Sequence, residues 1–192
     1  MNKKIINETP ENITKLEKNE IFVFGSNLAG IHGAGAAKTA LNKFGAIMGN
    51  GVGIQGNSFA IPTKDENLNV LPISEIGIYI NDFINHCYYG KFHYYITKIG
   101  CGLAGYRPFD IAPLFANFYF NVHYNIYPKE NFSLPYEFID IIKKKEYVYD
   151  YVYNKITVGD TILRPLYSNF QEYKVVKILD RSIKCINNRS ET

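Results

Sequence analysis

The sequence has no tryptophan, only three cysteines, and no apolar run that approaches the roughly 18 residues needed to span a membrane. Cys87, Cys101 and Cys185 cannot all pair with one another, and their spacing is not that of metal ligands. We therefore expect a protein of a reducing cytoplasm, with no metal, no cofactor and no membrane partner. The opening segment, MNKKIINETPEN, also lacks the apolar core of a signal peptide.

Strong charge of either sign is also missing. The formal net charge is +3 at pH 7, which is too small to indicate a dedicated nucleic-acid binder, because such proteins cluster Lys and Arg. Hydrophobic residues make up 46% and charged residues 20% of the 192 residues, so a sizeable core can form and wholesale disorder is excluded. This length fits one domain, or one domain with a small appendage.

Short apolar runs between turn residues predict strands, and apolar side chains repeating every three or four residues predict helices. Strands are expected at residues 4–6, 21–24, 58–62, 92–99 and 123–126. Helices are expected at residues 36–44, 75–87, 108–115 and 135–145, with a turn or short helix at 10–18. The glycines of residues 46–57 predict a loop. Strand, loop and helix recurring in this order are typical of an α/β domain.

We divide the chain into an α/β domain at residues 1–145 and a small β-rich appendage at residues 146–192. In the appendage, short strands are predicted at residues 147–153, 161–164, 172–179 and 182–186, a pattern that resembles small SH3-like barrels. A unit of only about 45 residues is marginal by itself, so we expect it to dock on the first domain or on a partner.

Three loops follow predicted strands of the first domain, at residues 25–35, 63–69 and 100–107. Ligands of open α/β sheets bind beyond the carboxyl ends of the strands. The first and third loops are rich in glycine and lead into helices, so their backbone N–H groups can point at an anion. The alternative is that the glycines only let a tight turn pack.

Three blocks of sequence, one in each loop region, resemble the macrodomains that bind ADP-ribose. They are Asn27 with Gly33-Ala34-Gly35-Ala36, then Ile61-Pro62-Thr63-Lys64, and then Gly100-Cys101-Gly102-Leu103-Ala104-Gly105-Tyr106. The resemblance covers about residues 11–115. Its Pro-Thr-Lys block is similar to the branch of terminal ADP-ribose glycohydrolases and of antitoxins that remove ADP-ribose from DNA. It implies a three-layer α/β/α fold with a mixed central sheet.

The resemblance also implies roles for individual residues. Asn27 would bond the hydroxyls of the distal ribose, the third loop would wrap the diphosphate, and Tyr106 would lie against that ribose. Lys64 would attack the anomeric carbon of the ribose, whereas a surface lysine paired with Asp65 or Glu66 is the alternative. The ligand-binding residues implied in this way are Asn12, Ile13, Ser26, Asn27, Gly33, Ala34, Gly35, Thr63, Gly100, Cys101, Gly102, Leu103, Ala104, Gly105 and Tyr106.

The sequence departs from the family pattern at two positions. Ala104 stands where glycohydrolases of this branch can carry an acidic residue, so Asp65 or Asp110 would have to act as the acid or base. Asn12 stands where many macrodomains hold the adenine with an Asp. Its uncharged amide predicts weaker or altered recognition of the base, because hydrogen bonds to charged groups are the stronger ones.

Three further residues allow two interpretations each. His32 would touch a phosphate or would simply be exposed, Cys101 would be a nucleophile or a small packing residue, and Arg107 would pair with the diphosphate or with solvent.

Two classes of function follow from these observations. One is an enzyme that hydrolyses an ADP-ribosyl bond on a protein, a nucleic acid or a small metabolite. The other is a binder that reads or sequesters ADP-ribose or a related nucleotide. A third, weaker interpretation is an unrelated α/β nucleotide protein with similar glycine loops.

Overall fold

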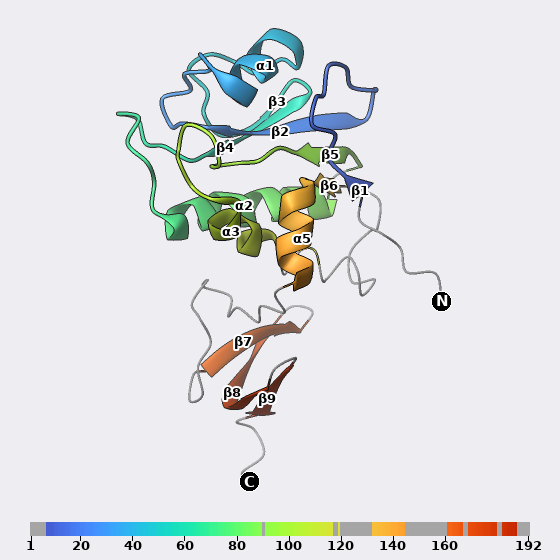
Figure 1. The fold of residues 1–192 in the computed structure, drawn as a ribbon, viewed down its shortest axis with the longest axis vertical. Helices are drawn as coiled ribbons and strands as arrows, with labels where there is room; N and C mark the ends of the chain where they lie inside the picture. Colours follow the sequence, from blue (N-terminus) through green and yellow to red (C-terminus); the bar gives the residue numbers. More distant parts are fainter. Residues whose placement is uncertain are drawn as a thin grey trace. The chain divides into compact units, whose positions relative to one another are not determined.

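A computed structural model describes residues 7–89, 91–116, 119, 132–144, 161–166, 169–179 and 182–187. The chain divides into two compact units, Met1–Ile141 and Ile142–Thr192. The first is a mixed α/β unit, and the described residues of the second from Thr161 onward form strands (Figure 1). Among the described residues, no helix has the length and apolar content needed to cross a membrane.

The first unit is organised around a six-stranded mixed sheet with the order β1-β6-β5-β2-β4-β3. Its strands are β1 Asn7–Glu8, β2 Glu20–Ser26, β3 Gly53–Gln55, β4 Ser58–Pro62, β5 His93–Ile96 and β6 Phe132–Leu134. All neighbouring pairs are parallel except β3 and β4. Val23 in β2 lies opposite Phe59 in β4 and Ile96 in β5. The carboxyl ends of β5, β2 and β4 therefore meet at one edge.

Helices lie on both faces of this sheet (Figure 1). The helices are α1 Gly35–Lys43, α2 Ile73–Tyr89, α3 Pro108–Ile111, the 3₁₀ turn η1 Ala112–Phe115 and α5 Tyr136–Lys144. Phe22 and Phe24 of β2 form a buried cluster with Ala40 of α1. On the opposite face, the rings of Phe59 and Phe83 of α2 are 5.0 Å apart. The alternation of side chains along the strands thus buries both faces, which confirms the α/β class.

The longer predicted elements of this unit are confirmed. The strand predicted at 58–62 is β4 to the residue, and the helices predicted at 36–44, 75–87 and 135–145 are α1, α2 and α5. The strand predicted at 92–99 is shorter, because the chain turns at its end with a bond from Ile99 N to Thr97 O.

Several predictions need correction or lie outside what is described. Where a turn or a short helix was expected at 10–18, the structure has no helix among these described residues, and Ile13 and Leu16 pack against the buried cluster beneath α1. Strand β3 lies inside the segment predicted as a loop, and β6 was not predicted. The strands predicted at 4–6, 123–126 and 147–153 lie outside the described residues.

The second unit contains a three-stranded antiparallel sheet with the order β7-β8-β9. Its strands are β7 Thr161–Leu166, β8 Asn169–Leu179 and β9 Ser182–Asn187. They confirm the strands predicted at 161–164, 172–179 and 182–186. An irregularity between Val175 and Lys177 shifts the register of β8 against β9.

Candidate functional site

The three loops that the sequence singled out meet at Gly25. A Cβ built on Gly25 would lie 3.4 Å from Gly100 N and 3.7 Å from Thr63 Cγ2. This follows from the strand order, because the loops begin at the carboxyl ends of the adjacent parallel strands β2, β4 and β5. The fold therefore brings together the regions predicted to bind a nucleotide.

Backbone hydrogen bonds join the first loop to the loop at residues 63–69, which carries Lys64. Thr63 N donates to Ser26 O at 3.0 Å, and Leu28 N donates to Lys64 O at 2.9 Å. Ser26 and Thr63 are both buried, and their hydroxyls donate to the carbonyls of Gly51 and Ser26, respectively. These two side chains tie the loops to one another beneath the surface.

Asn27 is half-buried and clamps its own loop with its side-chain amide. Its Nδ2 donates to Ile31 O at 2.7 Å, and its Oδ1 accepts from Ile31 N at 2.9 Å. A side-chain amide has two donor hydrogens and two acceptor lone pairs. One of each is left, so Asn27 can serve a pair of hydroxyls while the loop stays closed.

Some glycines of this region are required by packing, and others are not. Gly30 and Gly51 are required by packing, because an added Cβ would lie 2.3 Å from Asn50 N and 1.9 Å from Asn27 O, respectively. By contrast, no atom of the described structure lies within 4 Å of a Cβ added to Gly33, Gly35, Gly102 or Gly105.

Among these open glycines, Gly35 and Gly105 have positive φ angles of 55° and 77°, which favour glycine. Gly33 and Gly102 have neither a positive φ nor a close neighbour. Packing of the turn therefore does not account for glycine at these two positions.

The start of α1 lies beside the open glycines of the first loop. Within the described residues, its N-cap Ala34 makes no side-chain capping bond, and no acidic side chain lies in its first turn. The first N–H groups of a helix have no partner inside the helix, and they carry the positive end of its dipole. This end of α1 can therefore donate to an anion.

Lys64 and Asp65 lie at the base of a hairpin formed by residues 63–71. Asp65 closes the hairpin, because its Oδ1 accepts from Asn67 N at 2.9 Å and Asn69 N at 2.8 Å. Its Oδ2 accepts from Asn69 Nδ2, and this bond is the main cause of its lowered pKa. Asp65 thus stays ionised and holds the loop. Across the described part of the chain, Lys64 makes no ion pair.

The second glycine loop, residues 100–107, is also ordered from within. Gly105 N donates to Gly102 O at 2.9 Å, and Tyr106 N donates to Gly100 O at 3.0 Å. Burial raises the pKa of Cys101 to about 11, and the nearby charge of Glu137 adds to this. Cys101 is therefore a protonated thiol at neutral pH, which favours its interpretation as a packing residue. Leu103 is 77% exposed at the tip of the loop.

Arg107 and Asp110 are committed to one another. Arg107 Nε and Nη2 bond the two carboxylate oxygens of Asp110 at 3.0 and 2.9 Å, and Arg107 N donates to the same carboxylate at 3.0 Å. Hydrogen bonding to Arg107 is the main cause of the lowered pKa of Asp110. The two candidates for a substitute acid, Asp65 and Asp110, are thus both ionised and occupied.

Asn12 is exposed, whereas Ile13 packs against the cluster beneath α1. The charge of their neighbour Glu11 influences the pKa of Lys98, a residue that lies just before the second glycine loop. The pKa of Lys98 is raised mainly by its bond to Glu137 Oε1 at 2.7 Å, and the charge of Glu11 raises it further. Lys98 and Glu137 were not singled out by sequence, since nothing local pairs them.

His32 is neither exposed nor placed to touch a phosphate, so both interpretations of it are wrong. Its side chain is fully buried, its Nε2 donates to Asn50 O at 3.0 Å, and its ring lies edge-on to Phe24 at 5.3 Å. The reason is that the first loop packs against residues 49–51, which buries the histidine between them and β2.

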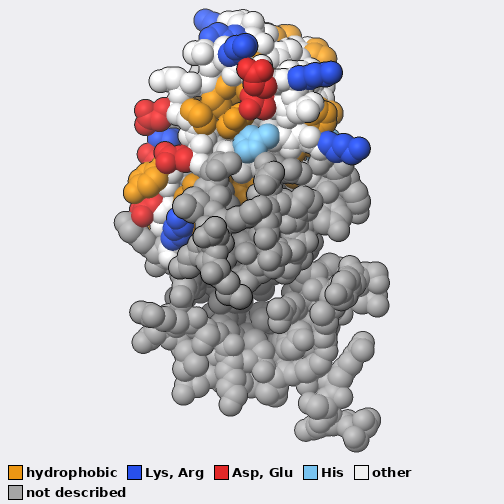
Figure 2. All heavy atoms as spheres, turned by 90° about the vertical axis from the view of Figure 1, so that its right-hand side faces the viewer, with side chains coloured by type: hydrophobic (Ala, Val, Ile, Leu, Met, Phe, Trp, Pro, Cys, Tyr) orange, Lys and Arg blue, Asp and Glu red, His pale blue; other side chains and the backbone are white. Residues whose placement is uncertain are grey.

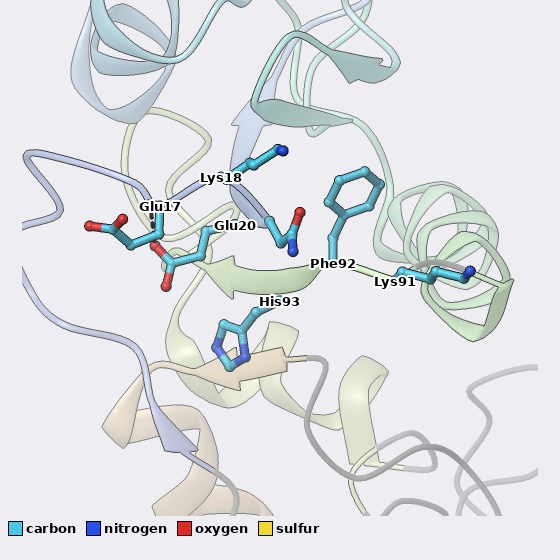
Figure 3. A pocket seen from close by; sticks show the side chains of 7 residues that line it. Glu17, Lys18, Glu20, Lys91, Phe92 and His93 are labelled. Carbon is cyan, nitrogen blue, oxygen red and sulfur yellow. Dashed lines mark hydrogen bonds between the residues drawn. The ribbon is translucent and has the colours of Figure 1, made fainter.

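A separate hollow of about 470 Å³ lies at the amino ends of β2 and β5 (Figure 3). Its lining residues are Glu17, Lys18, Asn19, Glu20, Lys91, Phe92 and His93. Glu20 already accepts from Tyr95 Oη at 2.9 Å and from Glu17 N at 2.7 Å. On this side of the molecule, acidic, basic and hydrophobic side chains are interspersed rather than gathered by kind (Figure 2). Sequence reasoning did not anticipate this hollow.

Among the residues with described positions, no group of three or more His, Cys, Asp or Glu side chains could hold a metal ion. Comparisons with models of protein families, with curated proteins and with solved structures find no match. Function is therefore inferred from the residues and from the geometry of the loops.

Proposed function

We propose that the chain binds ADP-ribose, or a nucleotide of similar build, at the carboxyl ends of β5, β2 and β4. The observation that carries the proposal is the open backbone at Gly33 and Gly102, on two loops that converge at Gly25. A ligand that lies directly on the backbone requires positions without a side chain. It would account for two glycines that neither conformation nor packing requires.

The parts of the ligand match the groups available at this edge. The diphosphate would lie between the uncapped start of α1 and the N–H groups of the second glycine loop. The free donor and acceptor of Asn27 suit the hydroxyls of the distal ribose. The exposed amide of Asn12 would contact the base without a charge, so recognition of the base is expected to be weak.

The chemistry that we propose is hydrolysis of an ADP-ribosyl bond with Lys64 as the reactive amine. The lone pair of Lys64 Nζ would form a bond to the anomeric carbon while the bond from that carbon to the leaving group breaks. The proton that Nζ loses would pass to the leaving group, and the sugar ring of the adduct would open to an imine. Water would then add to the imine carbon and the carbon–nitrogen bond would break with a proton returned to Nζ, which releases ADP-ribose and restores the amine. The absence of an ion pair to Lys64 among the described residues leaves its amine available for this step.

A non-catalytic binder is the second candidate, and the acidic residues favour it. Both hydrolytic steps need a proton donor or acceptor, yet Ala104 offers none. Asp65 and Asp110 are held by Asn69 and Arg107. Such a protein would read or sequester ADP-ribose without changing it.

The proposal also covers the second unit and the macromolecular partner. We assign its three-stranded sheet to an SH3-like appendage that docks on the first unit or on a partner. An ADP-ribosylated protein or nucleic acid in the cytoplasm would be the macromolecular substrate or target.

Calorimetry with ADP-ribose tests the binding step. Binding with an affinity on the order of micromolar, lost in Asn27→Ala but kept in Asn19→Ala, is the expected result. Asn19 is the matched control because it is an exposed asparagine at the amino ends of the strands. Absence of binding to ADP-ribose and similar nucleotides would overturn both candidates.

Borohydride trapping then divides the enzyme from the binder. An ADP-ribosylated substrate should become linked to Lys64 in the enzyme and to no residue in the binder. If Lys64→Ala leaves hydrolysis intact, the proposed mechanism is wrong.

A further inference from the structure

Tyr106 joins the second glycine loop to the hairpin that carries Lys64. Its Oη donates to Leu71 O at 2.6 Å, across 35 residues of sequence. At its other end, Tyr106 N donates to Gly100 O, and its ring carbon Cδ2 lies 3.7 Å from a Cβ built on Gly100. The tyrosine therefore spans from the start of the glycine loop to a segment that follows a different strand.

Leu71 is the far end of the lysine hairpin and is tied to its near end. Leu71 N donates to Thr63 O at 3.1 Å, and Lys64 pairs with Val70 in an antiparallel bridge. Leu71 is also only 5% exposed, so its carbonyl sits in a fixed, packed position. A bond to Leu71 O thus grips the hairpin at its base, next to Lys64.

The Tyr106 hydroxyl has one hydrogen, which it donates in the hydrogen bond to Leu71 O. The hydroxyl therefore cannot also donate to a ligand, although the ring remains free to lie against one. Burial and the charge of Asp110 raise the pKa of Tyr106, so the hydroxyl stays a donor over the neutral range. The hydroxyl therefore has a structural role in bonding Leu71 O, whereas any contact with a ligand would be made by the ring.

We propose that Tyr106 is a positioning residue, whose hydroxyl holds the lysine hairpin in register with the glycine loop. This rests on the proposed function: a diphosphate seated on the glycine loop would then present its ribose at a fixed place relative to Lys64. The hydroxyl sets where the amine stands, whereas the affinity for the ligand comes from the loop backbone.

The test compares Tyr106→Phe with Tyr95→Phe. The control removes a similar bond, from Tyr95 Oη to Glu20 Oε1 at 2.9 Å, at the other end of the strands. Hydrogen exchange of the ligand-free proteins should show amides of residues 63–71 exchanging about 3 to 10 times faster in Tyr106→Phe alone, as loss of one net hydrogen bond implies.

The second experiment measures how readily the Lys64 amine is acetylated. Acetic anhydride labelling at saturating ADP-ribose should show that the nucleotide protects Lys64 in the wild type and in Tyr95→Phe. In Tyr106→Phe this protection should fall by about 3-fold or more, while calorimetry finds an affinity within about 3-fold of the wild type.

Three results would separate the explanations. Unchanged exchange of residues 63–71 in Tyr106→Phe overturns the proposal regardless of any ligand. A large loss of affinity with intact protection of Lys64 makes the Tyr106 hydroxyl a ligand contact and also overturns it. If the wild type binds no ADP-ribose but exchange rises only in Tyr106→Phe, the positioning role of the Tyr106 hydroxyl stands and the proposed function fails.

Discussion

The two ends of the parallel strands carry similar side chains but expose different backbones. At the amino ends, Lys18, Asn19 and Phe92 line a hollow. At the carboxyl ends, Lys64 and Asn27 lie on loops that converge. Judged by side chains alone, either end could be taken for a site.

The backbone distinguishes the two ends. At the amino ends, Asn19 O accepts from His93 N at 2.8 Å, and Glu17 N donates to Glu20 at 2.7 Å. At the carboxyl ends, Gly33 and Gly102 leave the backbone open. A nucleotide is held by fixed polar groups more than by long exposed side chains. An accessible backbone, rather than a hollow or a lysine, thus distinguishes the candidate site from the amino ends.

The largest expected effect concerns a glycine that packing requires. Gly51→Ala would place a Cβ 1.9 Å from Asn27 O, so the loop must move. Overpacking of this kind is expected to lower the free energy of unfolding by about 3 kcal/mol. Urea unfolding measures the loss, with Gly33→Ala as the control because its Cβ meets no described atom. Equal stability of the two variants would remove the distinction between the packed and open glycines.

A large effect on chemistry, but not on binding, is expected from Lys64→Ala. If Lys64 forms the covalent intermediate, hydrolysis of an ADP-ribosyl substrate should fall by about 100-fold or more, as for other residues that act in the chemical step. Calorimetry should find the affinity for ADP-ribose little changed. Lys18→Ala, at the amino ends, is the matched control and should keep both properties.

The smallest expected effect is on stability and depends on pH. The folded-state pKa of Asp110 is lowered by Arg107, so their pairing stabilises the protein above the ordinary aspartate pKa of 3.8. Arg107→Ala should therefore be slightly less stable than the wild type at neutral pH, and this gap should close as the pH falls below 3.8. Thermal unfolding from pH 7 down to pH 2 measures it. A gap of the same size at every pH would argue against the ion pair as its cause.

The sequence predicted the elements whose pattern is long enough to read locally. Strand β4 and helix α5 were found because apolar runs and turn residues bound them. Strands β3 and β6 have three residues each. Strand β3 depends on pairing with β4, and β6 depends on pairing with β5, which lies far from it in sequence. Too few residues are present there for a period-two pattern to stand out.

The site shows the same limit. The meeting of the loops at Gly25 could be expected, because parallel strands align their carboxyl ends. The burial of His32 could not, because it depends on how the first loop packs against residues 49–51. Local sequence does not contain that geometry.

The most direct test of the central claim is calorimetry of Gly102→Val with ADP-ribose. A Cβ added to Gly102 meets no described atom within 4 Å beyond its chain neighbours, and Gly102 has no positive φ, so the variant should unfold within about 0.5 kcal/mol of the wild type. It would nevertheless occupy the space where the nucleotide is proposed to lie on the backbone. We predict that binding of ADP-ribose is lost in Gly102→Val and retained in Asn19→Ala. Wild-type affinity in a folded Gly102→Val would contradict the account.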